Sequence, residues 1–120
     1  MAGNSAARAH HTETVDRRWD GPAAERGLGQ NASQRQFRQL FAWIDSTNTH
    51  ARTAHKFPHH EVSRDGKVGP ANVRAVRTAI AILNGARGGA KIPDADRRPV
   101  YRHLAPHLND AGEEPPSLKD

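Results

Sequence analysis

Histidine is the residue type with the most chemical scope in this chain, since there are eight among 120 residues and no cysteine. His103 and His107 are four residues apart, which is the spacing of two zinc ligands on one helix face. Three more, enough to complete a zinc site, lie in a second segment: His55, His59 and His60. Pro106 disturbs the spacing of the helical pair, however, and no acidic residue between the two could serve as a hydrolytic base. We therefore expect hydrogen-bonded structural histidines, no metal and no cofactor.

Other catalytic groups are also missing from the sequence pattern. The lack of cysteine excludes disulfides, thiolate zinc sites and thiol catalysis. Gly85, Gly88 and Gly89 do not form a phosphate loop, because no Lys-Ser or Lys-Thr pair follows them and no strand precedes them. They are interpreted as a flexible link between helices, and we expect no catalytic residues.

The charge of the chain points to an acidic partner. The net charge is +5 and the pI about 10.4. Six arginines could contact phosphates or an acidic protein face: Arg74, Arg77, Arg87, Arg97, Arg98 and Arg102. Because no helix-turn-helix, zinc finger or aromatic RNA platform accompanies them, a protein face is favoured. The partner-binding residues predicted among them are Arg74, Arg77, Arg97 and Arg98; an ordinary solvated basic surface is the plain alternative.

Residues 1–33 are predicted to be an extended arm. They contain four glycines and few sizeable apolar residues, with no helical or strand period. A segment of this kind buries too little surface to offset its ordering entropy. Trp19 is the exception, and we expect it to anchor the arm on a partner; folding back onto its own domain is the alternative.

The domain over residues 34–112 should begin with a helix capped by Ser33 or Asn31. Its apolar stripe, with Trp43 off the stripe and half-exposed, is Phe37, Leu40, Phe41 and Ile44. A hairpin follows, because Asp65-Gly66 favours a tight turn, and Gly69-Pro70 should end the return strand.

Two more helices are expected after the hairpin. One starts near Pro70 and carries a stripe of Val73, Val76, Ile80 and Leu83. The other follows Ile92-Pro93, and Pro106 should kink or end it. The fold class is therefore α+β and mainly helical, in the order helix, β-hairpin, helix, helix, with an acidic Pro-rich tail over residues 113–120.

Five strings in this order resemble a module associated with the head (capsid) proteins of tailed phages. They are Lys56 to His60, Asn84 to Gly89, Ile92 to Arg98, Val100 to Leu104 and Glu113 to Pro116. The module is often encoded with, or fused behind, the prohead maturation protease, and the resemblance covers roughly residues 40–118. Pro99 and Pro106 depart from the family pattern. The chain has no length left for a protease body, so protease activity does not transfer.

The resemblance implies a non-enzymatic minor capsid or decoration (cement-like) protein of a tailed phage. The expected location is the virion, after synthesis in the host cytoplasm, and the expected partner is the major capsid protein. Self-association on the capsid lattice is a second option, nucleic acid is a less favoured partner, and no membrane is expected. Two alternatives stay open: a nucleic-acid-binding internal virion protein, and an assembly factor that works with the prohead protease.

Overall fold

A computed structural model describes residues 13–28, 33–44, 55–63 and 65–119, apart from the side chains of residues 34 and 55. Its elements in chain order are β1 (Thr14–Val15), α1 (Gly21–Leu28), α2 (Gln34–Leu40), β2 (Phe41–Ile44), β3 (His55–Pro58), β4 (His60–Val62), β5 (Val68–Asn72), α3 (Val73–Leu83), a 3₁₀ turn η2 (Ala86–Gly88) and α4 (Asp94–Asp110). The α+β class predicted from the sequence is confirmed. Among the helices described, none combines the length and the apolar character needed to cross a bilayer.

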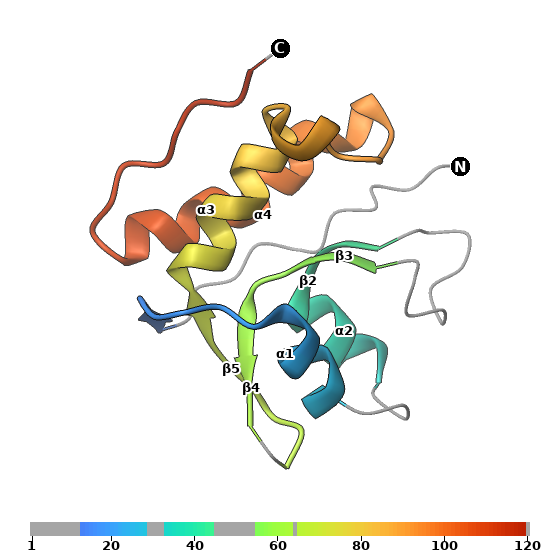
Figure 1. Cartoon of the computed structure of the whole chain (residues 1–120), viewed down its shortest axis with the longest axis vertical. Helices are drawn as coiled ribbons and strands as arrows, with labels where there is room; N and C mark the ends of the chain where they lie inside the picture. Colours follow the sequence, from blue (N-terminus) through green and yellow to red (C-terminus); the bar gives the residue numbers. More distant parts are fainter. Residues whose placement is uncertain (1–12, 29–32, 45–54, 64, 120) are drawn as a thin grey trace.

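The strands lie between two pairs of helices (Figure 1). Helices α3 and α4 pack side by side on one side, and α1 and α2 contact the strands from the other. The strands form two small sheets, one in the order β1-β5-β4 and one of β2 with β3. β1 runs parallel to β5, whereas the β4–β5 and β2–β3 pairs are antiparallel.

The first helix of the predicted domain is shorter than expected. Ser33 caps it as predicted, and the side chain of Gln36 returns a bond to the backbone of Ser33. The helix ends at Leu40, and Phe41 adopts an extended conformation (φ −105°, ψ 146°). The expectation of one helix through Ile44 is therefore wrong: residues 41–44 form β2, pair with β3 and are buried on both faces. An apolar run this short has no period that separates a buried strand from a helix.

Trp43 lies in the core and is not half-exposed as expected. It is 7% exposed, and its indole Nε1 donates to Asp96 Oδ2 at 2.9 Å. Because Asp96 lies in the first turn of α4, this bond joins β2 to that helix.

The hairpin predicted around Asp65-Gly66 is present as β4 and β5. Gly66 has φ +81°, a conformation that favours glycine. The return strand does not stop at Gly69-Pro70 but continues to Asn72, and α3 begins at Val73 rather than near Pro70. The reason is the Asn72 side chain, which accepts hydrogen bonds from the backbone N–H groups of Arg74 and Ala75 and so fixes the start of the helix.

Helix α4 continues through Pro99 and Pro106 to Asp110. Of the two outcomes expected at Pro106, a kink or the end of the helix, the second is therefore wrong. Each proline removes one backbone donor from the helix. The buried side chains of α4 pack with those of α3 and offset this loss: Val100, Leu104 and Leu108.

Residues 13–28 also differ from the extended arm predicted for residues 1–33. They contain β1 and α1, and α1 lies against β4 and β3. Asp20 Oδ1 accepts from Ala23 N at 3.0 Å, and Ala24 and Leu28 are buried at helical spacing. The sequence pattern did not predict α1, because only two buried residues mark its apolar face in a segment rich in glycine and alanine. The rest of the expected arm, residues 1–12 and 29–32, lies outside the described residues.

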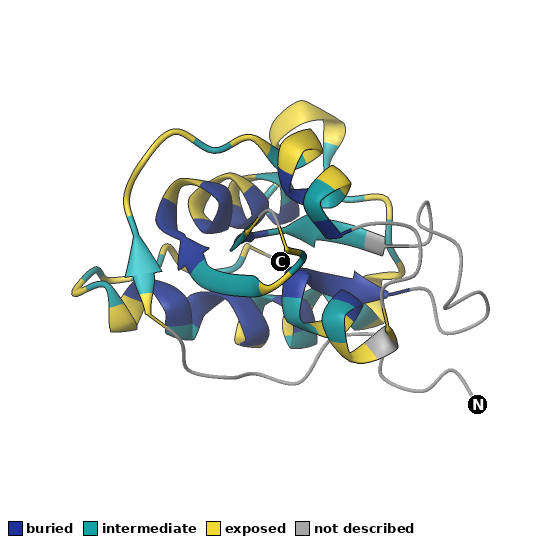
Figure 2. Cartoon of the chain, turned by 90° about the horizontal axis from the view of Figure 1, so that it is seen from below, coloured by how far each residue is buried: buried dark blue, intermediate teal, exposed yellow. Residues whose placement is uncertain are grey.

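Two apolar clusters make the core, and Figure 2 shows their buried residues on facing sides of the helices and strands. The larger joins α3, α4 and β2, with Phe57 packed against it. The smaller joins α1, α2 and Phe41 of β2, with Trp19, Val62 and Val68 packed against it. Between the elements of both lies a group of buried polar side chains.

Candidate functional site

Four histidines meet in the interior of the domain. His59 joins β3 to β4, His60 begins β4, and His103 and His107 lie one turn apart on α4. Their exposed fractions are 0%, 1%, 0% and 0%. Histidine is a residue of intermediate burial in most proteins, so four fully buried imidazoles in one place are a distinctive feature of this core.

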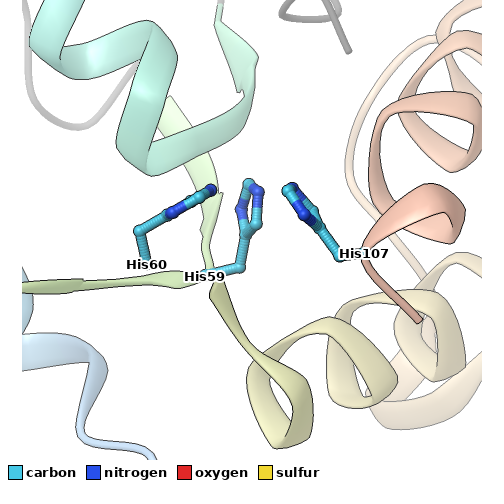
Figure 3. A group of neighbouring side chains, drawn as sticks. All are labelled: His59, His60 and His107. Carbon is cyan, nitrogen blue, oxygen red and sulfur yellow. The ribbon is translucent and has the colours of Figure 1, made fainter. Parts of the chain in front are cut away.

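The four rings are in contact with one another. Nε2 of His59 lies 3.1 Å from Nε2 of His103, and the ring centroids of His59 and His60 are 4.5 Å apart. His107 lies 5.1 Å from both His59 and His60 by the same measure. One ring nitrogen from each of His59, His60 and His107 falls within 4.8 Å of the others. Figure 3 shows the ring of His59 between the rings of His60 and His107.

Backbone carbonyls define the tautomers of the two strand histidines. Nδ1 of His59 lies 2.9 Å from the carbonyl oxygen of Phe57, and Nδ1 of His60 lies 2.8 Å from that of Gly69. A carbonyl oxygen only accepts, so each Nδ1 carries the proton and donates it. Each Nε2 therefore presents a lone pair. In metal sites, ligating histidines are commonly oriented in this way by a carbonyl on the second ring nitrogen.

The backbone around His59 is fixed by the end of α2 and by β5. Its N–H donates to Leu40 O at 2.9 Å, and its carbonyl accepts from Asn72 N at 2.7 Å. Phe57, whose carbonyl holds the His59 ring, has φ +65°, a left-handed conformation that costs energy for a bulky residue. Such strain is held in place only where the surrounding structure determines it, and it is common at functional sites.

Burial keeps the strand histidine neutral. Loss of hydration lowers the pKa of His59 well below its usual value of 6.5, and the neighbouring His60, His103 and His107 lower it further. A neutral imidazole is the form that binds a transition metal. The chemistry available to His59 is therefore either metal ligation or hydrogen bonding to the neighbouring rings.

These histidines were expected to be structural, because Pro106 disturbs the helical pair and no acidic residue lies between His103 and His107. The objection from Pro106 no longer holds, since α4 is continuous and places His103 and His107 on the same buried face. The side chain of His55, the fifth histidine considered, lies outside the described residues.

The structure distributes the predicted partner-binding residues over two helices and the segment before α1, and does not collect them in one patch. Arg74 Nε donates to Asp16 Oδ1 at 3.0 Å, which lowers the pKa of that carboxyl. Arg77 binds Glu113, with Nε 3.0 Å from Oε1. Arg97 donates to two backbone carbonyls at 2.8 Å each, and Arg98 is exposed. Three of the four predicted arginines therefore have partners inside the chain.

Trp19 packs against the smaller apolar cluster and is partly exposed. It also lines a groove of about 450 Å³ that sequence reasoning did not anticipate. The other lining residues are Gly21, Pro22, Phe57, Pro58, Arg74, Ala75, Thr78, Ala79, Ile82 and Arg87. The groove is thus lined by apolar residues together with Arg74 and Arg87. No sequence signal could locate it, because its walls come from three separate segments.

No family model, curated protein or solved structure matches the chain.

Proposed function

We propose that this chain is a non-enzymatic structural protein of a tailed-phage head that binds the major capsid protein. The observation that carries the proposal is that the strings which resemble the phage module contact one another in the fold. Nε2 of His59, in the first string, is 3.1 Å from Nε2 of His103, in the fourth. Tyr101 Oη, in the fourth, donates to the carbonyl of Pro116, in the fifth, at 2.6 Å. These contacts join the strings into one folded unit.

The shared module is proposed to span roughly residues 40–118, from the end of α2 through the β4–β5 hairpin, α3 and α4 to the tail, in the order expected from the sequence. The tail from Glu113 to Lys119 belongs with it, since Asn84 Nδ2 donates to Ser117 O at 3.0 Å and Asn84 Oδ1 accepts from Lys119 N at 2.7 Å. These bonds seat the tail along the α3–α4 pair (Figure 1).

A structural role accounts for the histidines better than a catalytic one. General acid–base catalysis needs a group within hydrogen-bonding reach of a substrate. His59, His60, His103 and His107 are at most 1% exposed, so a substrate has no contact with them. Their role is therefore assigned to the stability of the domain.

The proposed contact with the capsid is the groove beside Trp19. Its lining residues include Phe57, Ala79, Ile82 and Arg87. This combination fits a capsid-protein segment that presents an apolar side chain next to a carboxylate, because charge complementarity fixes the register of an apolar contact. Many copies on a repeated lattice would add by avidity.

A protein partner is favoured over nucleic acid by the state of the arginines. Arg74, Arg77 and Arg97 each bond to groups of their own chain. Phosphate binding releases counterions in proportion to the cations used, and cations already paired contribute less. The assembly-factor alternative uses the same surfaces and differs only in whether the protein stays in the mature particle.

Pelleting with empty capsids tests the groove. Thr78→Arg places a long charged side chain in the groove wall, and Ala81→Arg makes the same change at another exposed position of α3 that does not line the groove. We expect the first variant to lose binding by about tenfold or more, as for a change of roughly 1.4 kcal/mol or more, and the second to pellet like the parent. Equal binding by both variants would exclude the groove as the contact.

A further inference from the structure

We propose that the four buried histidines hold one divalent transition-metal ion, with zinc the best suited, and that this ion has a structural role. The ligands assigned are Nε2 of His59, Nε2 of His60 and one ring nitrogen each of His103 and His107. This inference concerns the interior of the domain and does not depend on the capsid function proposed above.

The distances between the histidine nitrogens are close to those of a zinc site. In a tetrahedral zinc site the Zn–N bonds are about 2.0–2.1 Å, which places neighbouring nitrogens about 3.3 Å apart. The two Nε2 atoms of His59 and His103 are already 3.1 Å apart. Nitrogens of His59, His60 and His107 lie within 4.8 Å of one another, and His103 adjoins this group through its contact with His59. Rotation of the rings would bring the four nitrogens to the corners of one tetrahedron.

The ring protons of His59 and His60 are placed as they are in metal-ligating histidines. Nδ1 of His59 and Nδ1 of His60 both donate to backbone carbonyls, those of Phe57 and Gly69. Both Nε2 lone pairs are thereby turned toward the other rings, and the carbonyls would share the charge of an ion bound between them. Two strand histidines oriented independently in the ligand tautomer are expected for a metal site and are not required by packing.

Four imidazole ligands favour zinc over other ions. Imidazole nitrogens suit zinc, copper, nickel and iron, whereas calcium and magnesium prefer oxygen. Four protein ligands leave no open position, which is the pattern of structural zinc sites. The exposed fraction of every ligand is 1% or less, so the ion would be enclosed as the domain folds.

The ion would join the strand histidines to α4. His59 and His60 lie at the junction of the two sheets, and His103 and His107 lie on α4, more than 40 residues later. The core itself is small and rich in alanine, and the mean hydropathy of the chain is −0.85. Small domains with limited cores often use a metal for stability.

The test uses the full chain without a histidine tag. The protein is unfolded in denaturant with a chelator, refolded without metal, and given one equivalent of zinc. We expect one zinc per chain by elemental analysis and a rise in Tm of roughly 10 °C when zinc is at about 100 times Kd. Cobalt in place of zinc should give the visible absorption of a tetrahedral site without a thiolate band.

Variants separate ligand loss from loss of stability. His60→Gln and His107→Gln should lose stoichiometric zinc, whereas Val100→Ala empties a buried position of α4 and should melt lower while still binding one equivalent. The parent protein keeps the proposal testable even where a histidine variant does not fold. A refolded parent that retains no zinc, and whose Tm is unchanged by an excess of zinc, would overturn it.

Discussion

His59 and His103 place their Nε2 atoms 3.1 Å apart in the interior of the domain, 44 residues apart in sequence. His59 carries its proton on Nδ1, so without a metal His103 donates from Nε2 to the lone pair of His59. For Nε2 of His103 to hold a metal, the ring would carry its proton on Nδ1 instead and so stay neutral. The same pair of atoms thus connects β3 and β4 to α4 in either state, and the stability of the domain should depend on it.

The apolar clusters make the most direct stability prediction. Phe41 is 1% exposed in the smaller cluster, and Leu83 is 3% exposed in the larger. Phe41→Ala and Leu83→Ala should each lower the free energy of unfolding by about 2–5 kcal/mol, because each leaves a cavity. Urea unfolding measures the loss, and Arg98→Ala, at an exposed position, is the control. A loss near zero for either variant would mean that the residue is not in the core.

Trp19 should contribute to the stability of the isolated protein as well as to binding. It packs against the smaller cluster and also lines the groove. Trp19→Ala should therefore lower the free energy of unfolding by about 1–3 kcal/mol and also weaken binding to capsids. Thermal melting and capsid pelleting report the two effects separately. An unchanged Tm together with lost pelleting would favour the original interpretation of Trp19 as an anchor on a partner.

The C-terminal segment should behave as part of the domain. Leu118 packs against the larger cluster, and the Asn84 side chain bonds the backbone on both sides of it, at Ser117 and Lys119. Asn84→Ala should speed amide hydrogen exchange at Lys119, because its N–H loses its acceptor. Exchange in the middle of α3 should stay the same. Rapid exchange at Lys119 in the parent chain would show that the tail is not seated there.

Acid should destabilise the domain before the carboxylates titrate. The pKa of His59 is lowered in the folded protein, mainly by burial, whereas an unfolded histidine has a pKa of about 6.5. As the pH falls through 6.5, the unfolded state binds protons first, so the stability present above that pH is lost below it. Metal binding also requires the neutral ring, so a bound metal would likewise make the domain less stable as the pH falls. Tm should therefore fall between pH 8 and pH 5, and a constant Tm over this range would contradict a buried neutral cluster.

The sequence was sufficient for the elements whose signals are local. The Ser33 cap, the Asp65-Gly66 turn and the stripe of α3 depend on neighbours within a few positions, and all are present. Residues 41–44 became a strand because β3 offers them partners, which no local pattern reveals. Similarly, α4 survives Pro106 because its buried face packs on α3.

In the candidate site, too, the local features were predictable from the sequence and the long-range ones were not. The spacing of His103 and His107 predicted a shared helix face, whereas the meeting of that face with His59 and His60 depends on tertiary structure. The decisive contacts are long-range backbone bonds, from His59 N to Leu40 O and from Asn72 N to His59 O. The groove beside Trp19 likewise arises only when the segment before α1 lies near β3 and α3.

The central claim, that this chain is a structural component of a tailed-phage head, is tested most directly by the protein content of purified mature particles from a phage or prophage that encodes it. Quantitative mass spectrometry of intact particles gives the ratio of this chain to the major capsid protein. The account predicts a fixed ratio that is reproduced between preparations and is lowered by Thr78→Arg but not by Ala81→Arg. Its absence from both immature and mature particles would contradict the account; presence in immature particles alone would instead support the assembly-factor alternative.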